Sequence, residues 1–145
     1  MNVRSAYLDT SAIVKRYVVE EHTARVDELY NEAHAGRITI GFSVWNIGEV
    51  AVVLDKYQKR GFLNNARAVF EKFIGETRFL IKINQLKLIS LNSKTMILAT
   101  SYVFKHGIYI ADAVQLASAK GFDEFLSFDK EIAQIARIEG FNVKT

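Results

Sequence analysis

The sequence predicts an α/β fold, a single domain with a central parallel sheet of about four to five strands and helices on both faces. Short apolar segments alternate along the chain with longer segments whose apolar residues recur at helical spacing. The chain has 145 residues, of which 50% are hydrophobic and 24% are charged. A chain of this length and composition can form one domain with a substantial core.

The first two elements are a strand and a helix that follows it directly. Residues 3–8 are expected to form the strand, because the segment becomes apolar toward its end. The helix is expected over residues 10–19, where Ala12, Ile13 and Tyr17 share one helical face. This arrangement predicts a sharp strand-to-helix junction.

The next elements are marked by residues that end or begin helices. A helix over residues 23–35 ends before Gly36, which suits the left-handed backbone of a helix C-terminus. Residues 37–42 (Arg-Ile-Thr-Ile-Gly-Phe) are rich in β-branched and aromatic side chains and predict the second strand. Ser43 is expected to cap the third helix, over residues 44–60.

The second half of the chain continues the alternation. A fourth helix is expected over residues 63–83 and a third strand over residues 86–91. Ser93 is expected to cap the following helix, which ends near His106 because Gly107 terminates it. The remaining elements are expected to be helices over residues 110–120 and 130–139, a strand over residues 125–128 and a short edge strand over residues 141–144.

Composition and charge exclude several classes of protein. No apolar run approaches the roughly 20 residues of a membrane span and no signal-peptide core is present, so we expect a cytoplasmic protein that does not act at a membrane. The absence of cysteine excludes disulfides, thiolate zinc sites and cysteine nucleophiles. The formal net charge of +3 slightly favours an anionic partner such as nucleic acid.

Four acidic residues occupy positions that favour a ligand site. Asp9 and Asp129 follow predicted strands, where helix capping is the alternative role. Glu49 and Asn46, three residues apart, are the polar side chains of an apolar stretch of the third helix, and a thin solvent face is the alternative there. Asp112 lies in the first turn of a later helix, where the helix dipole also favours a purely structural anion.

In a parallel sheet these acids can converge at one edge. Two ionised carboxylates about 4 Å apart repel by roughly 4 kcal/mol at an effective dielectric constant near 20, and a divalent cation removes that repulsion. Oxygen ligands without cysteine or histidine favour Mg²⁺ or Mn²⁺. Hydroxyl and amide side chains near the acids are candidates for orienting them: Ser11, Ser127 and Asn46.

The sequence resembles PIN-domain ribonucleases, and most of all the VapC-type toxins of toxin–antitoxin pairs. Residues 7–12 (Tyr-Leu-Asp-Thr-Ser-Ala) resemble the opening motif of the family and residues 43–49 resemble the second. Residues 111–119 resemble the third motif and residues 126–129 the fourth. The four motifs occur in the order of the family and span nearly the whole chain, which makes the resemblance specific.

The resemblance implies a catalytic site with four acidic metal ligands: Asp9, Glu49, Asp112 and Asp129. Ser11 and Thr10 would be the hydroxyl companions of the first acid. The implied activity is that of an endoribonuclease in which Mg²⁺ or Mn²⁺ activates a water for in-line attack on a phosphodiester and stabilises the leaving oxygen. The products would carry a 5′-phosphate and a 3′-hydroxyl.

Basic residues are candidates for holding the RNA substrate. The densest group lies at the end of the third helix and either binds phosphates or forms a solvated face: Lys56, Lys59 and Arg60. The histidines fall near helix ends without metal-like spacing, so we expect structural roles for them: His22, His34 and His106.

The third and fourth predicted helices are rich in aromatic residues: Trp45, Tyr57, Phe62, Phe70, Phe73 and Phe79. These side chains either pack the core or form a homodimer face or a groove for a partner helix. The resemblance implies a small antitoxin protein that such helices receive. We therefore expect a homodimer and an antitoxin partner.

Other functions match parts of the pattern. A haloacid-dehalogenase phosphatase needs a second Asp two residues after the first acid, where this chain has Ser11. A response-regulator receiver needs an acidic pair near the first strand, and Asp9 has no acidic neighbour in the sequence. The residues leave open a non-toxin RNA-processing nuclease and a catalytically silent PIN scaffold that binds protein or RNA.

Overall fold

The computed structural model describes residues 4–145, so residue 3 of the predicted first strand lies outside the described part. Five strands form one parallel sheet: β1 (Arg4–Leu8), β2 (Ile38–Ser43), β3 (Leu86–Ile89), β4 (Glu124–Leu126) and β5 (Val143–Lys144). β3 ends at Ile89 rather than at the predicted residue 91, because Ile89 pairs with Ser43, the last residue of β2. The predicted α/β class and parallel sheet are confirmed.

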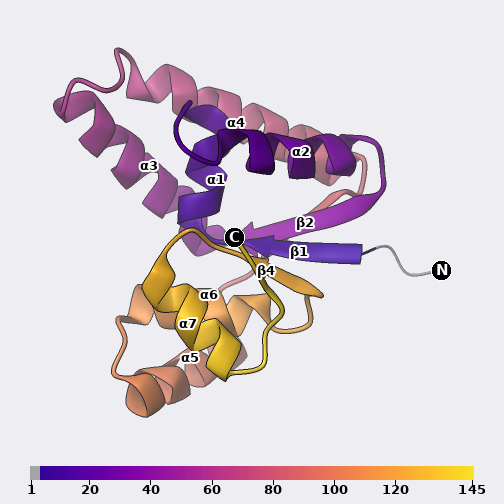
Figure 1. Cartoon of the computed structure of the whole chain (residues 1–145), viewed down its shortest axis with the longest axis vertical. Helices are drawn as coiled ribbons and strands as arrows, with labels where there is room; N and C mark the ends of the chain where they lie inside the picture. Colours follow the sequence, from indigo (N-terminus) through magenta and orange to yellow (C-terminus); the bar gives the residue numbers. More distant parts are fainter. Residues whose placement is uncertain (1–3) are drawn as a thin grey trace.

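Helices cover both faces of the sheet, as predicted. They are α1 (Thr10–Tyr17), α2 (Thr23–His34), α3 (Val44–Lys59), α4 (Ala66–Lys82), α5 (Ser93–His106), α6 (Ile110–Ala119) and α7 (Lys130–Ile138). Figure 1 shows α1, α2 and α4 on one side of the sheet and α5, α6 and α7 on the other, with α3 alongside α4. Within residues 4–145 no helix is long and apolar enough to cross a membrane.

The direction of the strand order reverses between β1 and β4. The sheet has the order β3-β2-β1-β4-β5, so the chain proceeds outward from β1 through β2 and β3 and then returns to the other side for β4. Tyr7 of β1 pairs with both Gly41 of β2 and Phe125 of β4. Open α/β sheets bind ligands at the carboxyl ends of strands where such a reversal occurs. Asp9 and Asp129 follow the two strands that flank this point.

The core is built around the aromatic residues of the central strands. Tyr7 and Phe125 are fully buried and stack with ring centroids 5.7 Å apart. Phe122, in the loop before β4, packs edge-on against Tyr7. A Cβ added at Gly41 would lie 2.4 Å from the Cζ atom of Phe122. The glycine in β2 therefore allows this loop to pack directly on the sheet.

Two further elements, α1 and β4, also end earlier than predicted, each for a local reason. α1 ends at Tyr17 rather than at residue 19, because the backbone is extended at Val18 (φ −122°, ψ 121°). β4 ends at Leu126 rather than at residue 128, since the N–H of Phe128 donates to Ser11 Oγ and not to a neighbouring strand. In both cases the difference concerns only the last two residues of the predicted element.

Two helices begin at asparagine caps that the sequence analysis did not identify. α4 begins at Ala66 and not at residue 63, because the Asn65 side chain accepts a hydrogen bond from the N–H three residues later. The predicted cap Ser93 is wrong. Asn92 caps α5 instead, and its Oδ1 accepts a hydrogen bond of 2.9 Å from the N–H of Thr95.

Candidate active site

A cavity of about 340 Å³ opens at the carboxyl ends of β1 and β4, and all four predicted acids line it: Asp9, Glu49, Asp112 and Asp129. Asp9 lies between β1 and α1, and Asp129 lies between β4 and α7. Glu49 comes from the second turn of α3, and Asp112 comes from the first turn of α6. Four elements far apart in the sequence therefore bring their carboxylates to one place.

Asp9 is buried and held by three donors. It is 4% exposed, and it caps α1 by accepting a 3.0 Å hydrogen bond from the N–H of Ala12. Ser11 Oγ donates to the same carboxylate oxygen at 2.6 Å, and Ser127 Oγ donates to the other at 2.5 Å. Burial raises the pKa of Asp9 to about 6, although the hydrogen bonds from Ser11 and Ser127 act in the opposite direction. Asp9 therefore both caps α1 and lines the cavity.

The same two serines join the strand ends to each other. Ser11 Oγ accepts a 3.0 Å hydrogen bond from the N–H of Phe128. Ser127 Oγ accepts a 3.1 Å hydrogen bond from the N–H of Asp129, whose own carboxylate caps α7 by accepting from Glu131 N–H. The turn after β1 and the turn after β4 are therefore held in a fixed relation.

Glu49 is oriented by a chain of hydrogen bonds that starts at the cap of α3. Thr10 Oγ1 donates to Glu49 Oε1 at 2.8 Å and accepts from Asn46 Nδ2 at 2.9 Å. Asn46 is completely buried, and its Oδ1 accepts a 2.7 Å hydrogen bond from the N–H of Ser43, the predicted cap. Asn46 thus acts on Glu49 through Thr10 rather than by direct contact.

Gln115, which was not predicted as a site residue, connects these hydrogen bonds to the sheet. Its Oε1 accepts hydrogen bonds of 2.8 Å from both Asn46 Nδ2 and the hydroxyl of Tyr7. Burial raises the pKa of Tyr7, so the phenol stays protonated and donates. Gln115 lines the cavity, and its buried Nε2 has no hydrogen-bond partner among the described residues. Its position one helical turn after Asp112 is the signal that identifies it.

Asp112 lies among other negative charges. Burial, together with the charges of Asp129, Glu49 and Glu131, raises the pKa of Asp112 to about 6. Within the described residues, no side chain donates a hydrogen bond to its carboxylate. Asp112 is therefore a carboxylate whose ionisation is opposed by its surroundings.

The lining contains one further acid and one base that the sequence analysis did not select. Lys15 and Glu20 both line the cavity, and their side chains form a 3.2 Å ion pair. The hydroxyl of Tyr57 also donates to Glu20, at 3.2 Å. Acidic side chains still outnumber basic ones around the cavity, which suits a cation.

The residues fit a hard divalent cation by the chemistry of their oxygens. Mg²⁺ and Mn²⁺ prefer carboxylate ligands and retain waters, and the cavity is large enough for a hydrated ion. Within residues 4–145, no three acidic or histidine side chains are grouped closely enough to hold a metal ion as they stand. The charges of Asp129 and Glu49 act on Asp112 across this separation, since they contribute to its raised pKa.

The predicted basic group of α3 lies apart from the cavity. Lys56, Lys59 and Arg60 are absent from its lining, although Tyr57 beside them contributes to it. Lys59 Nζ instead forms a 2.7 Å ion pair with Asp55. Lys56 follows Glu49 by two helical turns, which places it about 10 Å further along the helix.

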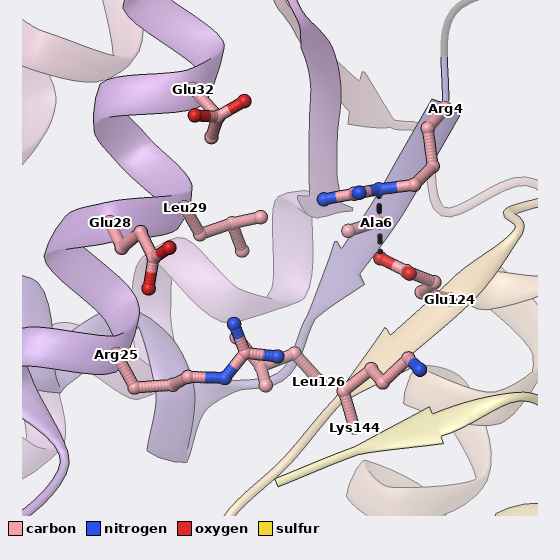
Figure 2. Close-up of a pocket in the computed structure, with 9 residues that line it drawn as sticks. All are labelled: Arg4, Ala6, Arg25, Glu28, Leu29, Glu32, Glu124, Leu126 and Lys144. Atoms are coloured by element: carbon pink, nitrogen blue, oxygen red, sulfur yellow. Dashed lines mark ion pairs between the residues drawn. The ribbon is translucent and has the colours of Figure 1, made fainter.

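Another cavity, of about 410 Å³, lies between α2 and the strands β1, β4 and β5, and Figure 2 shows it. Equal numbers of acidic and basic side chains line it: Arg4, Arg25, Glu28, Glu32, Glu124 and Lys144. Arg4 Nε lies 3.3 Å from Glu124 Oε2 on the neighbouring strand. The charges of this cavity are balanced, so the excess of acids around Asp9 distinguishes the candidate active site.

The sequence matches the PIN domain family over residues 6–138, and no curated protein sequence matches it. The sarcin-ricin loop cleaving toxin VapC20 of Mycobacterium tuberculosis has a similar structure, with a TM-score of 0.64 and 14% identity over 94% of this chain and 95% of that one. VapBC2 of Rickettsia felis, bound to a DNA fragment from its promoter, gives a TM-score of 0.59 and 16% identity over 97% of each chain. These likenesses show a shared fold. Because the family match covers most of the sequence, the chain belongs to the PIN domain family.

Proposed function

We propose that the chain is an endoribonuclease that hydrolyses RNA phosphodiester bonds with Mg²⁺ or Mn²⁺. The observation that carries the proposal is the cavity at the strand-order reversal, which four carboxylates from separate elements line. Membership of the PIN domain family supports it. The shared fold with a toxin described as cleaving the sarcin-ricin loop adds support for RNA as the substrate.

The chain's own residues have distinct tasks in this proposal. A bound divalent cation supplies the positive charge that activates a water and stabilises the leaving oxygen. Asp9, Glu49 and Asp112 form the core of its site, and Asp129 completes it at the exposed rim, where a water or a second ion has access. Ser11 and Ser127 orient Asp9, and Thr10 orients Glu49 with the support of Asn46.

We further propose that the chain is the toxin of a VapBC-type pair, with a small antitoxin protein as partner, and that it forms a homodimer. A groove of about 650 Å³ runs between α3 and α4, with Leu54, Phe70 and Ile74 in its lining. Of the aromatic residues predicted there, Phe73 is buried, whereas Phe62 and Phe79 are 68% and 50% exposed. An apolar groove between helices suits an amphipathic helix of a partner.

RNA cleavage tests the catalytic proposal. A mixed set of structured and single-stranded RNAs is incubated with the full chain and Mg²⁺, Mn²⁺ or EDTA, beside Asp9→Asn, Asp112→Asn and the exposed control Asp55→Asn. We expect metal-dependent cleavage, with 5′-phosphate products, by the wild type and Asp55→Asn. Cleavage should be lost in the other two variants. Cleavage that persists in both site variants, or no metal-dependent cleavage by the wild type, would contradict the proposal.

A further inference from the structure

A further cavity, of about 570 Å³, adjoins the acids on the far side of the turn between β4 and α7. It shares Ser127 and Asp129 with the surroundings of the active site, and its other walls include His22, Phe128 and one face of α7. Its volume lies within the range of about 300–1,000 Å³ that is typical of sites for small organic ligands. The cavity is thus large enough for part of a bound polymer that continues from the acids.

Phe128 lines the 570 Å³ cavity and belongs to an aromatic stack. The ring of His22 stacks on it, with centroids 4.8 Å apart and an interplanar angle of 16°. Lys15, which lines the acidic cavity, has its Nζ 5.3 Å from the centre of the Phe128 ring. Since Ser11 Oγ binds the N–H of Phe128 and also donates to Asp9, the stack has a fixed position relative to the acids.

His22 occupies the start of α2 in a left-handed backbone conformation. His22 has φ 70° and ψ 5°, a left-handed conformation that costs a residue with a side chain about 1–2 kcal/mol. It also occupies the N-cap of α2 without making a side-chain cap hydrogen bond. Glycine or asparagine would serve this backbone position better. The His22 side chain is 48% exposed, with its Nε2 3.5 Å from Oε1 of the exposed Glu21, so part of the ring is accessible to a ligand.

The face of α7 that borders the cavity carries two cations. Lys130 and Arg137 lie seven residues apart, which places them on the same side of the helix, with the small Ala133 between them. Among the described residues neither cation lies within ion-pair distance of an acid. Asp129 is the acid of this cavity, and a cation at the active site would offset its charge. These features provide an aromatic surface beside free positive charges.

We propose that this cavity binds a nucleotide of single-stranded RNA adjacent to the phosphodiester that is cleaved. The base stacks on the His22–Phe128 pair, and Lys130 and Arg137 bind the neighbouring phosphates. Stacking on aromatic side chains requires a base that is not already stacked in a duplex, so the segment is single-stranded. The placement of this nucleotide next to the cleaved bond rests on the proposed nuclease function.

Affinity for RNA tests the subsite without requiring cleavage. A fluorescein-labelled single-stranded RNA of mixed sequence, about 12 nucleotides long, is titrated with the full chain carrying Asp112→Asn, and binding is followed by fluorescence anisotropy. Adding His22→Asn should weaken binding about tenfold. Because asparagine suits the left-handed cap position, the melting temperature should be unchanged or higher. If His22 is purely structural, His22→Asn should leave RNA affinity unchanged and lower the melting temperature.

Charge variants provide the second arm of the test. In the Asp112→Asn protein, Lys130→Gln together with Arg137→Gln should weaken RNA binding and reduce the salt dependence of the affinity by about two counterions. The exposed control Lys82→Gln on α4 should bind RNA as tightly as the Asp112→Asn protein does. Unchanged affinity in both the His22 variant and the double variant would overturn the subsite, as would the absence of RNA binding by the background protein.

Cleavage by otherwise wild-type protein separates this inference from the proposed function. If the wild type and His22→Asn cleave RNA with the same KM and kcat, the nuclease stands and the subsite is wrong. If RNA affinity depends on His22 but the wild type cleaves no RNA, the nuclease is wrong and only an RNA-binding site remains. A higher KM in His22→Asn, with kcat nearly unchanged, is the result that supports both.

Discussion

At the scale of single residues, the four acids differ in how their charge is compensated. Asp9 receives hydrogen bonds from Ser11, Ser127 and the N–H of Ala12, so its geometry is fixed. Asp112 has acidic neighbours, and no side chain of the described residues donates to it. Asp112 is therefore an acid whose charge opposes folding without a compensating side-chain hydrogen bond.

Replacement of Asp112 by asparagine should therefore stabilise the protein at neutral pH. The carboxyl has a pKa of about 6 in the folded protein against an ordinary value of 3.8, so its contribution to stability falls as the pH rises from about 4 to about 6. In EDTA, we expect Asp112→Asn to match the wild type at pH 4. At pH 7.5 it should exceed the wild type by about 1 kcal/mol, after allowance for solvent screening.

Thermal unfolding in EDTA at both pH values measures this effect, with Asp55→Asn as the control for a change of exposed charge. A lower melting temperature for Asp112→Asn than for the wild type at pH 7.5 would show that the ionised carboxylate is not destabilising.

Thr10 should affect catalysis through Glu49. Thr10→Val keeps the shape of the side chain but removes the hydroxyl that donates to Glu49 and accepts from Asn46. We expect kcat/KM to fall by about 10- to 100-fold, as for other residues that orient metal ligands. Thr10→Ser should restore most of the activity in the same RNA cleavage assay. Equal activity of the valine and serine variants would exclude this orienting role.

The acids were predictable from the sequence because each follows a strand or lies in an otherwise apolar helix segment. The hydrogen bonds behind them were not, because Tyr7, Asn46 and Gln115 meet only after β1, α3 and α6 have packed together. His22 was expected to be structural. Its stacking on Phe128 joins residues that are distant in the sequence, and no local pattern indicates it.

At the scale of elements, the packing of the β4 loop on the sheet depends on Gly41. A methyl group there would meet the Phe122 ring at 2.4 Å and the carbonyl oxygen of Lys87 at 3.0 Å. Gly41→Ala should therefore lower the free energy of unfolding by about 1–3 kcal/mol. Urea denaturation measures the loss. In the double variant Gly41→Ala/Phe122→Leu, the loss of unfolding free energy should be smaller than the sum of the losses in the two single variants. Strictly additive losses would contradict the contact.

A second contact between elements joins α4 to α1 and α2. The Glu76 carboxylate accepts hydrogen bonds from Arg16, Tyr17 and His34, at distances of 2.8 to 2.9 Å. Burial alone would raise the pKa of Glu76, but these hydrogen bonds lower it to about 2. The stabilisation is therefore present above the ordinary pKa of 4.5 and is lost as the pH falls toward 2.

Glu76→Gln should destabilise the protein by about 2 kcal/mol at pH 7, because the amide cannot accept all of these charge-assisted bonds. Chemical denaturation at pH 7 and at pH 3 measures the difference from the wild type. The difference should shrink as the pH is lowered, and a difference that is constant with pH would contradict the assignment.

Element types were predictable because the alternation of apolar strands and amphipathic helices is a local property of the chain. Several boundaries were not. Asn65 and Asn92 cap α4 and α5, and several nearby polar residues match the local cap pattern equally well. The end of β4 depends on a hydrogen bond from Phe128 to Ser11, which the strand pattern alone does not reveal.

At the scale of the whole molecule, the strand order places the acids together. β1 and β4 are neighbours although more than half of the chain lies between them, and their carboxyl ends carry Asp9 and Asp129. α3 and α6 then bring Glu49 and Asp112 to the same cavity. A parallel sheet was predictable from the pattern, whereas the order of its strands depends on contacts distant in sequence.

Calorimetric titration of Mn²⁺ into the full chain at pH 7.5 tests most directly whether the four acids form one cation site, because it requires no knowledge of the RNA target. We expect binding by the wild type and by the control Asp55→Asn, and we expect it to be lost or greatly weakened in Asp9→Asn and Asp112→Asn. Binding that is equally strong in both site variants, or no binding by the wild type at millimolar Mn²⁺, would contradict a metal-dependent active site at this cavity.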